Sequence, residues 1–410
     1  MKKLLVAVIS KSDASGGGAG RSAETLTRLL IQNGHVAHHW LGYPSKRWLP
    51  SMRKLHGEFF GQMFYRSCLY LSRRIGLPDF ITPEIFFHIY RKEVDYDIYH
   101  FNDITITFSP IALRWLAKHT RVVWTFRDCS PFTGGCIYPL ECTAYMNDCG
   151  NCPQLGQWPL LTSIDRTGFV RRFKRTTARQ NLFIPVVPSN WMAEQAMSSG
   201  FFEEKPAVIY NSVNINLFRP LDKVTIRQIL QLPVDQFIVL IGSMELNNKF
   251  KGLNYALEAL RHIDPPPYIL AIGSPPKNIS DEFKGLNIHF TGYIQDDILL
   301  AQYYSAADIF LFPTLADNCP NSVLETMATA TPTIAFSVGG LPELIDHNST
   351  GLLVRPKNVS ELVAALRFAI DNVEKRISWG KAARLKVENS FNENILITKY
   401  LKLYHSLVDE

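Results

Sequence analysis

The chain has 410 residues, of which 46% are hydrophobic and 20% are charged. This composition is typical of a folded globular protein, and the length predicts two or three domains. No run approaches the 18 apolar residues of a membrane-spanning helix. The apolar start, Leu4 to Ser10, is too short for a signal peptide and no small-residue cleavage site follows it. We interpret it as a first strand and expect a cytoplasmic protein.

Positive charge is concentrated in the first half of the chain. Up to Tyr210 there are 25 Lys and Arg against 16 Asp and Glu, a net charge of +9. The remainder has 18 against 21, a net charge of −3, which together give the total of +6. A basic half should face an anionic partner. Since no nucleic-acid recognition motif accompanies the charge, we expect no nucleic acid, but a pyrophosphate-linked acceptor or the inner face of the plasma membrane.

The first strand leads into a glycine-rich segment, Gly16 to Gly20, and then into a predicted helix from Arg21 to Gln32. Strand, glycine loop and helix make the βα unit that binds phosphates. The dinucleotide fingerprint is not met, because Arg21 stands where its third glycine would be. The loop glycines Gly17 and Gly18 are candidates for donor contacts, and a merely flexible loop is the alternative.

Residues 46–77 interleave Lys, Arg and His with many aromatic and aliphatic residues. This pattern fits either an amphipathic helix on an anionic membrane surface or an ordinary helix packed against its domain.

Further on, Asp95-Tyr96-Asp97 matches a metal-binding D-x-D pattern, but it leads directly into the predicted strand Ile98 to Phe101. A metal site needs its carboxylates at the exit of a strand, so we interpret this motif as a turn that enters the strand.

A predicted strand from Val122 to Phe126 ends in Arg127-Asp128. Both residues are candidates for the catalytic machinery, since Asp128 could orient neighbouring groups. Arg127 could pair with Asp128 or contact a phosphate, and the sequence leaves both roles open.

Four of the seven cysteines follow within a short segment, as Cys136, Cys142, Cys149 and Cys152. Disulfides are rare in a reducing cytoplasm, and clustered thiols that close with Cys-Gly-Asn-Cys are typical of a structural zinc site. We predict structural zinc on these four thiols, with free or paired thiols as the alternative.

Polar, turn-rich residues from Val208 to Pro220 predict a boundary between two doubly wound units. We predict domains at residues 1–207, with a Cys-rich insertion at 129–153, and at 221–389. Residues 208–220 would be the linker, and a last helix within 390–410 would return to the first domain. In the second domain the predicted strands are Phe237 to Ile241, Tyr268 to Ile272, Ile288 to Phe290, Asp308 to Phe312 and Thr333 to Phe336.

The second domain carries two groups of candidate donor-binding residues. Lys251 precedes Gly252 at the start of a predicted helix, where a lysine can neutralise a diphosphate, and Lys249 is a second candidate. Asp317 and Glu325 lie eight residues apart, and Pro320 predicts the first turn of a helix from Asn321 to Ala330. Asp317 would lie at the mouth of this helix and Glu325 one turn inside. A helix N-terminus suits phosphate and a carboxylate suits sugar hydroxyls, so these residues predict a nucleotide-sugar site; a solvated acidic pair is the alternative.

The segment Asp317 to Glu325 resembles the E-x7-E motif of retaining family 4 glycosyltransferases, with Asp at the first position. The glycines of residues 16–20, Lys251-Gly252 and Gly339-Gly340 fit the same family. Phe-Thr-Gly-Gly-Cys136 and Cys149-Gly-Asn-Cys152-Pro resemble an insertion in its bacterial polysaccharide members. Two positions depart from the family pattern: Arg127 stands where histidine is common, and Ser243 about where arginine is common.

The resemblance implies a GT-B fold, which is an α/β architecture of two Rossmann-like doubly wound domains facing each other across a cleft. It implies transfer of a sugar, with retention, from a nucleoside diphosphate sugar to a glycan or an undecaprenyl-type lipid-linked acceptor, in O-antigen, capsule or exopolysaccharide synthesis. Catalysis would need no cofactor. Glu325 would bind the ribose and Asp317 would face the donor sugar. Further donor contacts would come from Asn318, Asn321, Ser322, Gly339 and Gly340. A catalytically degenerate nucleotide-sugar-binding subunit, or a GT-B epimerase or phosphorylase, is the alternative.

Overall fold

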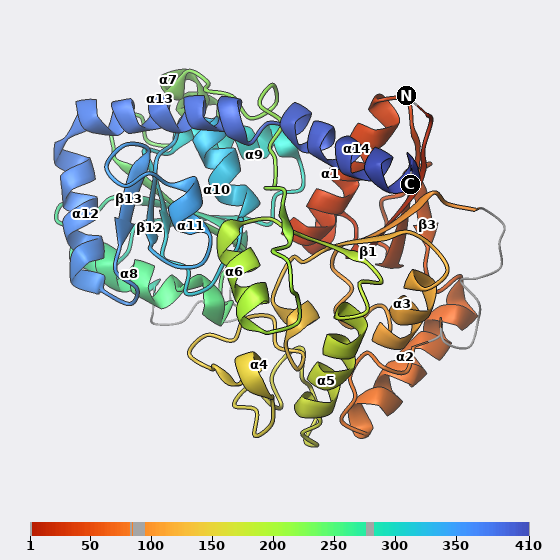
Figure 1. Cartoon of the computed structure of the whole chain (residues 1–410). Coiled ribbons are helices and arrows are strands. Elements are labelled where there is room, and N and C mark those ends of the chain that lie inside the picture. The colour runs from red at the N-terminus through yellow and green to blue at the C-terminus, as the bar shows by residue number, and fades with distance from the viewer. Residues whose placement is uncertain (1, 83, 85–94, 276–282, 410) are drawn as a thin grey trace. The chain divides into compact units, whose positions relative to one another are not determined.

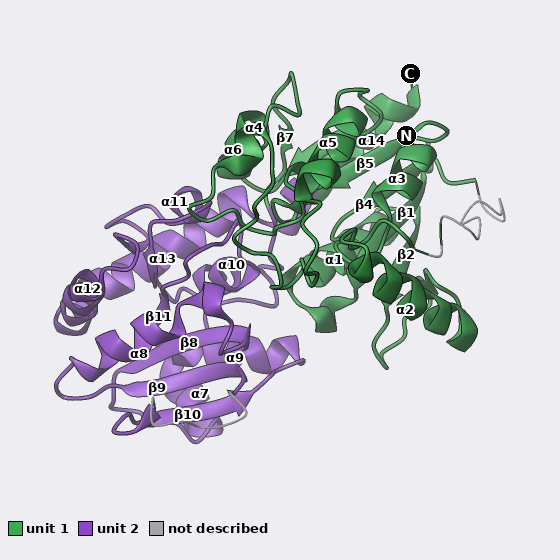
Figure 2. Ribbon diagram, turned by 90° about the horizontal axis from the view of Figure 1, so that it is seen from below, with its two compact units in different colours: residues 1–210, 397–410 green, residues 211–396 purple. Residues whose placement is uncertain are grey.

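The structure, a computed structural model, describes residues 2–82, 84, 95–275 and 283–409 (Figure 1). The chain divides into two compact units (Figure 2). Unit 1 comprises Met1–Tyr210 and Ile397–Glu410, and unit 2 comprises Asn211–Leu396. Each unit is built around one parallel sheet, so the prediction of two doubly wound α/β domains is confirmed. The finer domain bounds and the cleft stay predictions.

The sheet of unit 1 has seven strands, all paired in parallel. In spatial order they are β3 (Met52–Lys54), β2 (Val36–Tyr43), β1 (Leu5–Ser12), β4 (Ile98–Phe101), β5 (Val122–Thr125), β6 (Ile184–Val187) and β7 (Ala207–Val208). Strands β2 and β3 were not predicted from the sequence.

The helices of unit 1 are α1 (Gly18–Gln32), α2 (Phe59–Arg74), α3 (Pro110–Ala117), α4 (Ala144–Asn147), α5 (Thr167–Ala178) and α6 (Asn190–Ser198), with 3-10 turns at Ala14–Gly16 and Ser130–Phe132. The helices bury part of their apolar residues, although α2 leaves six large ones exposed. In α1, Ala23, Leu26, Leu29 and Leu30 are buried, as their helical spacing predicts. No described helix is long and apolar enough to cross a membrane.

The loop between β1 and α1 is shorter than predicted. Helix α1 begins at Gly18 rather than Arg21, and Gly17, at φ 111°, precedes its first turn. Gly20 lies inside the helix, where a Cβ would come within 2.2 Å of the Asp13 carbonyl oxygen. The missing side chain therefore lets the first turn of α1 pack directly on the end of β1, which shortens the loop.

The last helix, α14 (Glu393–Asp409), supplies two tyrosines to the core of unit 1. Tyr404 hydrogen-bonds His100 Nδ1 on β4, and Tyr400 OH lies 3.0 Å from Thr125 Oγ1 on β5. His100 Nε2 lies 2.8 Å from the same threonine oxygen. Burial keeps the pKa of His100 well below its usual value, so this network is a neutral one.

The sheet of unit 2 has six parallel strands, with α-helices between them. The strands are β10 (Ile288–Gly292), β9 (Tyr268–Ser274), β8 (Ile238–Glu245), β11 (Ile309–Phe312), β12 (Thr333–Phe336) and β13 (Gly351–Val354). The helices are α7 (Lys223–Ile229), α8 (Leu253–Arg261), α9 (Asp297–Ala306), α10 (Asn321–Ala328), α11 (Leu341–Leu344), α12 (Val359–Asp371) and α13 (Val373–Ser390). The predicted strands of this unit are confirmed.

The central strands β11 and β12 of unit 2 are almost entirely apolar, as is typical of a parallel sheet with helices on both faces. Every residue of β11 and β12 is buried, which explains why their sequences are continuous apolar runs rather than alternating patterns. The edge strand β10 is only partly buried and was correspondingly the shortest predicted strand.

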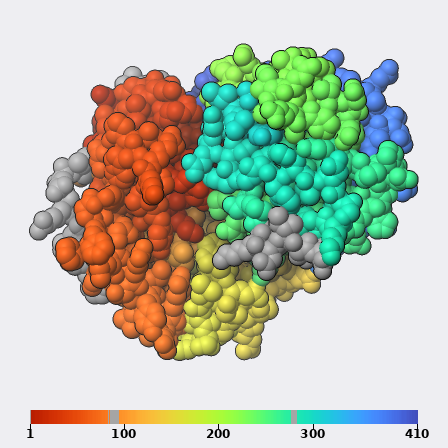
Figure 3. Space-filling model, turned by 180° about the vertical axis from the view of Figure 1, so that it is seen from behind, coloured from red at the N-terminus to blue at the C-terminus, as the bar shows by residue number. Residues whose placement is uncertain are grey.

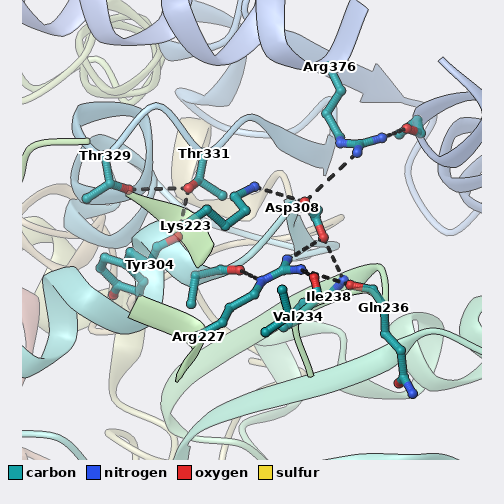
Figure 4. Close-up of polar contacts among 12 residues, drawn as sticks. Lys223, Arg227, Val234, Gln236, Ile238, Tyr304, Asp308, Thr329, Thr331 and Arg376 are labelled. Atoms are coloured by element: carbon teal, nitrogen blue, oxygen red, sulfur yellow. Dashed lines mark hydrogen bonds and ion pairs between the residues drawn. The ribbon is translucent and has the colours of Figure 1, made fainter. Parts of the chain in front are cut away.

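One buried carboxylate, Asp308, ties the start of β11 to three other elements (Figure 4). Its oxygens lie 2.8 Å from Lys223 Nζ and 2.6 Å from Arg227 Nη2, and one accepts a hydrogen bond from the Ile238 amide at 2.8 Å. Arg376 lies 3.9 Å away. Burial alone would raise the pKa of Asp308, but the lysine and arginine charges hold it below its usual value.

Replacing this carboxylate should therefore destabilise unit 2. Asp308→Ala leaves the buried guanidinium of Arg227 without its counter-charge, and we expect the free energy of unfolding to fall by about 3–5 kcal/mol. Chemical denaturation measures the change. The exposed Asp235→Ala, in the same unit, is the matched control and should change it by less than about 0.5 kcal/mol. Equal effects of the two substitutions would contradict the structural role of Asp308.

Candidate active site

The sheet of unit 2 changes direction between β8 and β11. From β8 the chain moves outward to β9 and β10, whereas from β11 it moves to the opposite edge through β12 and β13. In open parallel sheets, ligands bind outside the carboxyl ends of the strands at this switch point. The loop after β8 carries Lys251, and the loop after β11 carries Asp317. The topology therefore brings the two predicted groups of donor-binding residues to the same place.

Lys251 and Asp317 form an ion pair there, with Nζ 2.5 Å from Oδ2. The carboxylate is held from a second side, because Oδ1 accepts a hydrogen bond from the Asn318 amide at 3.0 Å. The ammonium group also lies 5.4 Å from the centre of the Phe312 ring. The side chain of Lys251 is 30% exposed and that of Asp317 is 10% exposed, so the lysine is the more accessible of the two partners.

Two glycines let three loops approach at backbone contact distance. Gly252 and Gly339 have φ values of 67° and 57°, in the left-handed region that favours glycine. A Cβ on Gly252 would lie 1.9 Å from the Pro313 carbonyl oxygen, and one on Gly339 would lie 1.8 Å from that of Asp317. Both positions therefore require glycine for conformation and for space.

Hydrogen bonds reinforce these backbone contacts. The Phe250 carbonyl accepts from the Leu315 amide at 2.7 Å and from Thr314 Oγ1 at 2.9 Å. The Gly340 amide donates to the Asp317 carbonyl at 3.2 Å. Residues 313–318 are thus held by the loop after β8 on one side and by the loop after β12 on the other, which fixes the Asp317 carboxylate before any ligand arrives.

Glu325 lies on α10, and its carboxylate is buried with 6% of the residue exposed. The Tyr304 hydroxyl donates a hydrogen bond to Oε2 at 3.2 Å. The helix differs in detail from the prediction. Pro320 is the residue before the first turn and not part of it, and α10 ends at Ala328, followed by Ala330 in the left-handed region at φ 58°.

Asn211 holds the segment before α10 in place. Its Nδ2 donates to the Cys319 carbonyl at 2.7 Å and to Asn321 Oδ1 at 2.9 Å. Neither Asn211 nor Tyr304 was predicted as a site residue. The polar run Asn211-Ser-Val-Asn carried a signal that the analysis used only for a domain boundary, whereas Tyr304 carries no pattern that distinguishes it from a core residue.

The remaining predicted donor-binding residues occupy different surroundings. Asn318 is buried beside Asp317, and Asn321 and Ser322 lie in the partly exposed first turn of α10. Lys249 is exposed, with Nζ 5.2 Å from the centre of the Phe250 ring. In the loop after β12, the Val338 amide donates to the Phe336 carbonyl, so this amide and that of Gly340 are both used within the chain.

The other predicted residues belong to unit 1, at the carboxyl ends of its central strands. Gly17 and Gly18 lie at the start of α1 after β1, and Arg127 and Asp128 follow β5. The Arg127 guanidinium donates to Asn102 Oδ1, with Nη2 at 2.6 Å and Nε at 3.1 Å. Asn102 follows β4, so this contact joins the ends of two neighbouring strands.

Asp128 is one of two interacting carboxylates. Burial raises its pKa to about 7, and the negative charge of Asp103 adds to the rise. The loop after β4 and the loop after β5 contact each other, since Thr105 Oγ1 lies 3.1 Å from Ser130 Oγ. Asp103 was missed by the sequence analysis. Its position directly after the strand Ile98–Phe101 was the available signal, because that is where parallel strands present functional side chains.

The four clustered cysteines are free thiols in the structure. Burial raises the pKa of Cys136 to about 12, and the charges of Cys149, Cys152 and Cys142 act in the same direction. Among the described residues, no group of three or more His, Cys, Asp or Glu is arranged so as to hold a metal ion. Binding of structural zinc by these thiols stays a prediction.

Comparison with known proteins places a sugar-transferase signature on unit 2. The family model described as glycosyl transferases group 1 matches residues 235–372, which include β8 to α12 and the Lys251–Asp317 pair. The chain is 27% identical over 214 residues to the sulfoquinovosyl transferase SQD2 of Arabidopsis thaliana, covering 50% of this chain and 41% of that one. It is also 27% identical over 202 residues to the putative teichuronic acid biosynthesis glycosyltransferase TuaC of Bacillus subtilis, covering 48% and 49%. The chain thus spans half or less of the length of these relatives.

Solved structures share the fold along the whole chain. A sucrose-phosphate synthase from Thermosynechococcus elongatus matches with a TM-score of 0.74, 20% identity and 99% coverage of both chains. HepE of Anabaena, in complex with UDP, matches with a TM-score of 0.69 at 18% identity, covering 99% of this chain and 100% of that one. The predicted α/β fold of two Rossmann-like domains, the GT-B fold, is confirmed.

The backbone contact at Gly339 leads to a specific expectation. Gly339→Ala should lower the free energy of unfolding by more than the roughly 1–2 kcal/mol of a left-handed alanine, because its Cβ would also clash with the Asp317 carbonyl. The matched control is Gly292→Ala, at φ 75° with no atom within 4 Å of its Cβ position. Denaturant unfolding gives the free energy of unfolding of both variants. Gly292→Ala reports the backbone strain alone, and the further loss in Gly339→Ala reports the clash. If the two variants were equally stable, the close loop contact would be wrong.

Proposed function

We propose that this protein is a retaining glycosyltransferase that moves a sugar from a nucleoside diphosphate sugar to a glycan or lipid-linked acceptor. The observation that carries the proposal is the Lys251–Asp317 ion pair at the switch point of unit 2, with the buried carboxylate of Glu325 on the adjacent helix. The match of residues 235–372 to glycosyl transferases group 1 supports the same reading.

Lys251 is suited to the diphosphate of the donor. Negative charge grows on the leaving diphosphate as the bond to the sugar breaks, and a fixed positive charge lowers the barrier to that step. Asp317 and the Phe312 ring hold the ammonium group in position, so little ordering remains to be done when the donor binds. Lys249, exposed two residues earlier, would add a second positive charge in place of the arginine that Ser243 replaces.

Backbone groups would complete the diphosphate site. In the loop after β12, the amides of Val338 and Gly340 are already used within the chain. We therefore assign the contact from this loop to the Gly339 amide. The first turn of α10, with Asn321 and Ser322, would add the partial positive charge of a helix N-terminus.

Glu325 would accept hydrogen bonds from the ribose hydroxyls. Its Oε2 accepts a hydrogen bond from the Tyr304 hydroxyl, which helps to fix the carboxylate in place. Ribose presents two further hydroxyl donors, which a carboxylate can accept together. Asp317, whose second oxygen is held by the Asn318 amide, would contact the donor sugar.

Unit 1 would receive the acceptor, and the departing phosphate would take the proton of the attacking hydroxyl. Arg127 and Asp128 would contribute there, and Gly17 and Gly18 at the start of α1 would contact the donor. The basic charge of this half suits a pyrophosphate-linked acceptor. A role in surface polysaccharide synthesis is supported by the similarity to TuaC, named for teichuronic acid biosynthesis.

Turnover of a nucleoside diphosphate sugar tests the proposal. We expect Lys251→Met to lower turnover by about 100–1000-fold, the usual cost of losing one charge-stabilising contact in the transition state. Glu325→Gln should weaken nucleotide binding while leaving the fold intact. Nucleotide release from a panel of donor sugars, starting with UDP sugars because the HepE structure holds UDP, measures the first effect, and thermal stabilisation by the nucleotide measures the second.

Lys375→Met and Glu374→Gln, both exposed on α13, are the matched controls and should behave as wild type. A wild-type protein that binds a nucleotide sugar without releasing nucleotide, with or without added acceptor, would contradict the transferase and favour the binding subunit. Acceptor-independent conversion of the sugar would favour an epimerase or a phosphorylase.

A further inference from the structure

Helix α2 of unit 1 presents its apolar residues outward. Phe60 is 84% exposed and Phe59 70%, and four further large side chains on the same helix are 39–61% exposed: Met63, Phe64, Tyr70 and Leu71. At 100° per residue, these six side chains lie within an arc of about 140° of the helix circumference. A surface helix of a globular protein normally shows the reverse pattern, with its polar face in water.

The inward side of α2 does not account for this arrangement. Its buried residues are Tyr65, Cys68, Leu69 and Ser72, a set that is smaller and more polar than the exposed one. Tyr65 stacks on His56 with ring centres 4.0 Å apart and lies 2.7 Å from the Tyr43 hydroxyl, so the helix is fixed to its unit by these contacts. These contacts do not involve Phe59 and Phe60, the two most exposed residues of the outward face, and water around such large apolar side chains costs free energy.

The apolar face continues beyond the end of the helix. Gly76 lies so close to Ile164 that a Cβ would come within 2.6 Å of its carbonyl oxygen. Ile164 is 43% exposed, and Phe169 on α5, which packs against Phe80 with ring centres 5.8 Å apart, is 47% exposed. Figure 1 places α2 at the periphery of unit 1, and Figure 3 shows the orange segment that contains it at the molecular surface.

The charges on this helix are all positive. Its 16 residues contain Arg66, Arg73 and Arg74 and no Asp or Glu. Arg66 and Arg74 are exposed on the apolar side, where the Arg74 guanidinium lies 5.2 Å from the centre of the Tyr70 ring. Aromatic residues mixed with arginine on the face of a helix that lies along a surface are suited to the headgroup region of an anionic bilayer.

We propose that the outer face of α2 docks on an anionic lipid bilayer, with the helix lying in the plane of the membrane. Sixteen residues are fewer than the roughly 20 that span a bilayer, which fits an interfacial position. A second copy of this chain fits less well, since a two-fold contact through α2 would bring the arginines of both copies together with no acidic residue on the helix to pair with them. The proposal is independent of the transfer reaction, because docking needs neither donor nor acceptor.

Vesicle flotation with the full chain tests this docking surface. Wild type should bind vesicles of phosphatidylcholine with phosphatidylglycerol, and bind phosphatidylcholine alone at least tenfold more weakly. Phe59→Ser with Phe60→Ser should reduce binding at least tenfold. Arg66→Gln with Arg74→Gln should reduce binding to the anionic vesicles by about fivefold per arginine, with the loss diminishing at high salt.

Ile377→Ser with Leu385→Ser is the matched control, since these residues on α13 are 52% and 57% exposed. This pair should bind as wild type, and circular dichroism checks that every variant is folded. Unchanged binding of the Phe59/Phe60 variant, or no binding of wild type to anionic vesicles, would overturn the proposal. If wild type were a dimer that did not bind vesicles, and the Phe59/Phe60 variant were a monomer, the face would belong to a contact with a second copy instead.

Discussion

The close approach of three backbone segments in unit 2 is the constraint on which the candidate site depends. Gly252 packs against the Pro313 carbonyl and Gly339 against the Asp317 carbonyl, at distances that exclude any Cβ. These contacts need left-handed backbone as well as empty space, so only glycine satisfies them. Because residues 313–318 are fixed from both sides, the Asp317 carboxylate can hold Lys251 without a ligand. Folding therefore supplies the free energy that orders the two side chains, and ligand binding does not have to supply it. This is the general advantage of a preorganised charge.

Parallel topology explains why the chemistry gathers at one edge of each sheet. Lys251 and Asp317 follow β8 and β11, and Asn102, Asp103, Arg127 and Asp128 follow β4 and β5. Each group thus lies at the carboxyl ends of adjacent central strands, where side chains of distant parts of the sequence converge. The strands themselves need only be apolar, since helices cover both faces. Asp308 is the exception at the opposite end of β11, where Lys223 and Arg227 compensate its buried charge.

Sequence patterns predicted the elements that are periodic or uniformly apolar. Five of the six strands of unit 2 and helix α1 follow directly from hydrophobic spacing, whereas β13 was not predicted. Strands β2 and β3 were not predicted because their apolar residues are mixed with His, Trp and Arg. Helix α1 was predicted to begin three residues too late because glycine is unfavourable inside a helix. Asp317, Glu325 and Lys251 could be proposed as site residues from local motifs, and their roles stay predictions. Asp103 and Asn211 carried a signal, as a position after a strand and as a polar run, but their contacts, like that of Tyr304, arise from neighbours far away in the sequence. The outward apolar face of α2 could be recognised as unusual only once the burial of each residue was known.

Hydrogen exchange with mass spectrometry, in the presence and absence of saturating UDP or another nucleoside diphosphate, tests the central claim most directly. The account predicts protection of amides in residues 249–252, 313–325 and 337–340, the three segments that meet at the switch point of unit 2. Protection should be lost in Lys251→Met and retained in Lys375→Met. Protection confined to unit 1, or protection of unit 2 that does not depend on Lys251, would contradict the assignment of these loops as the nucleotide site.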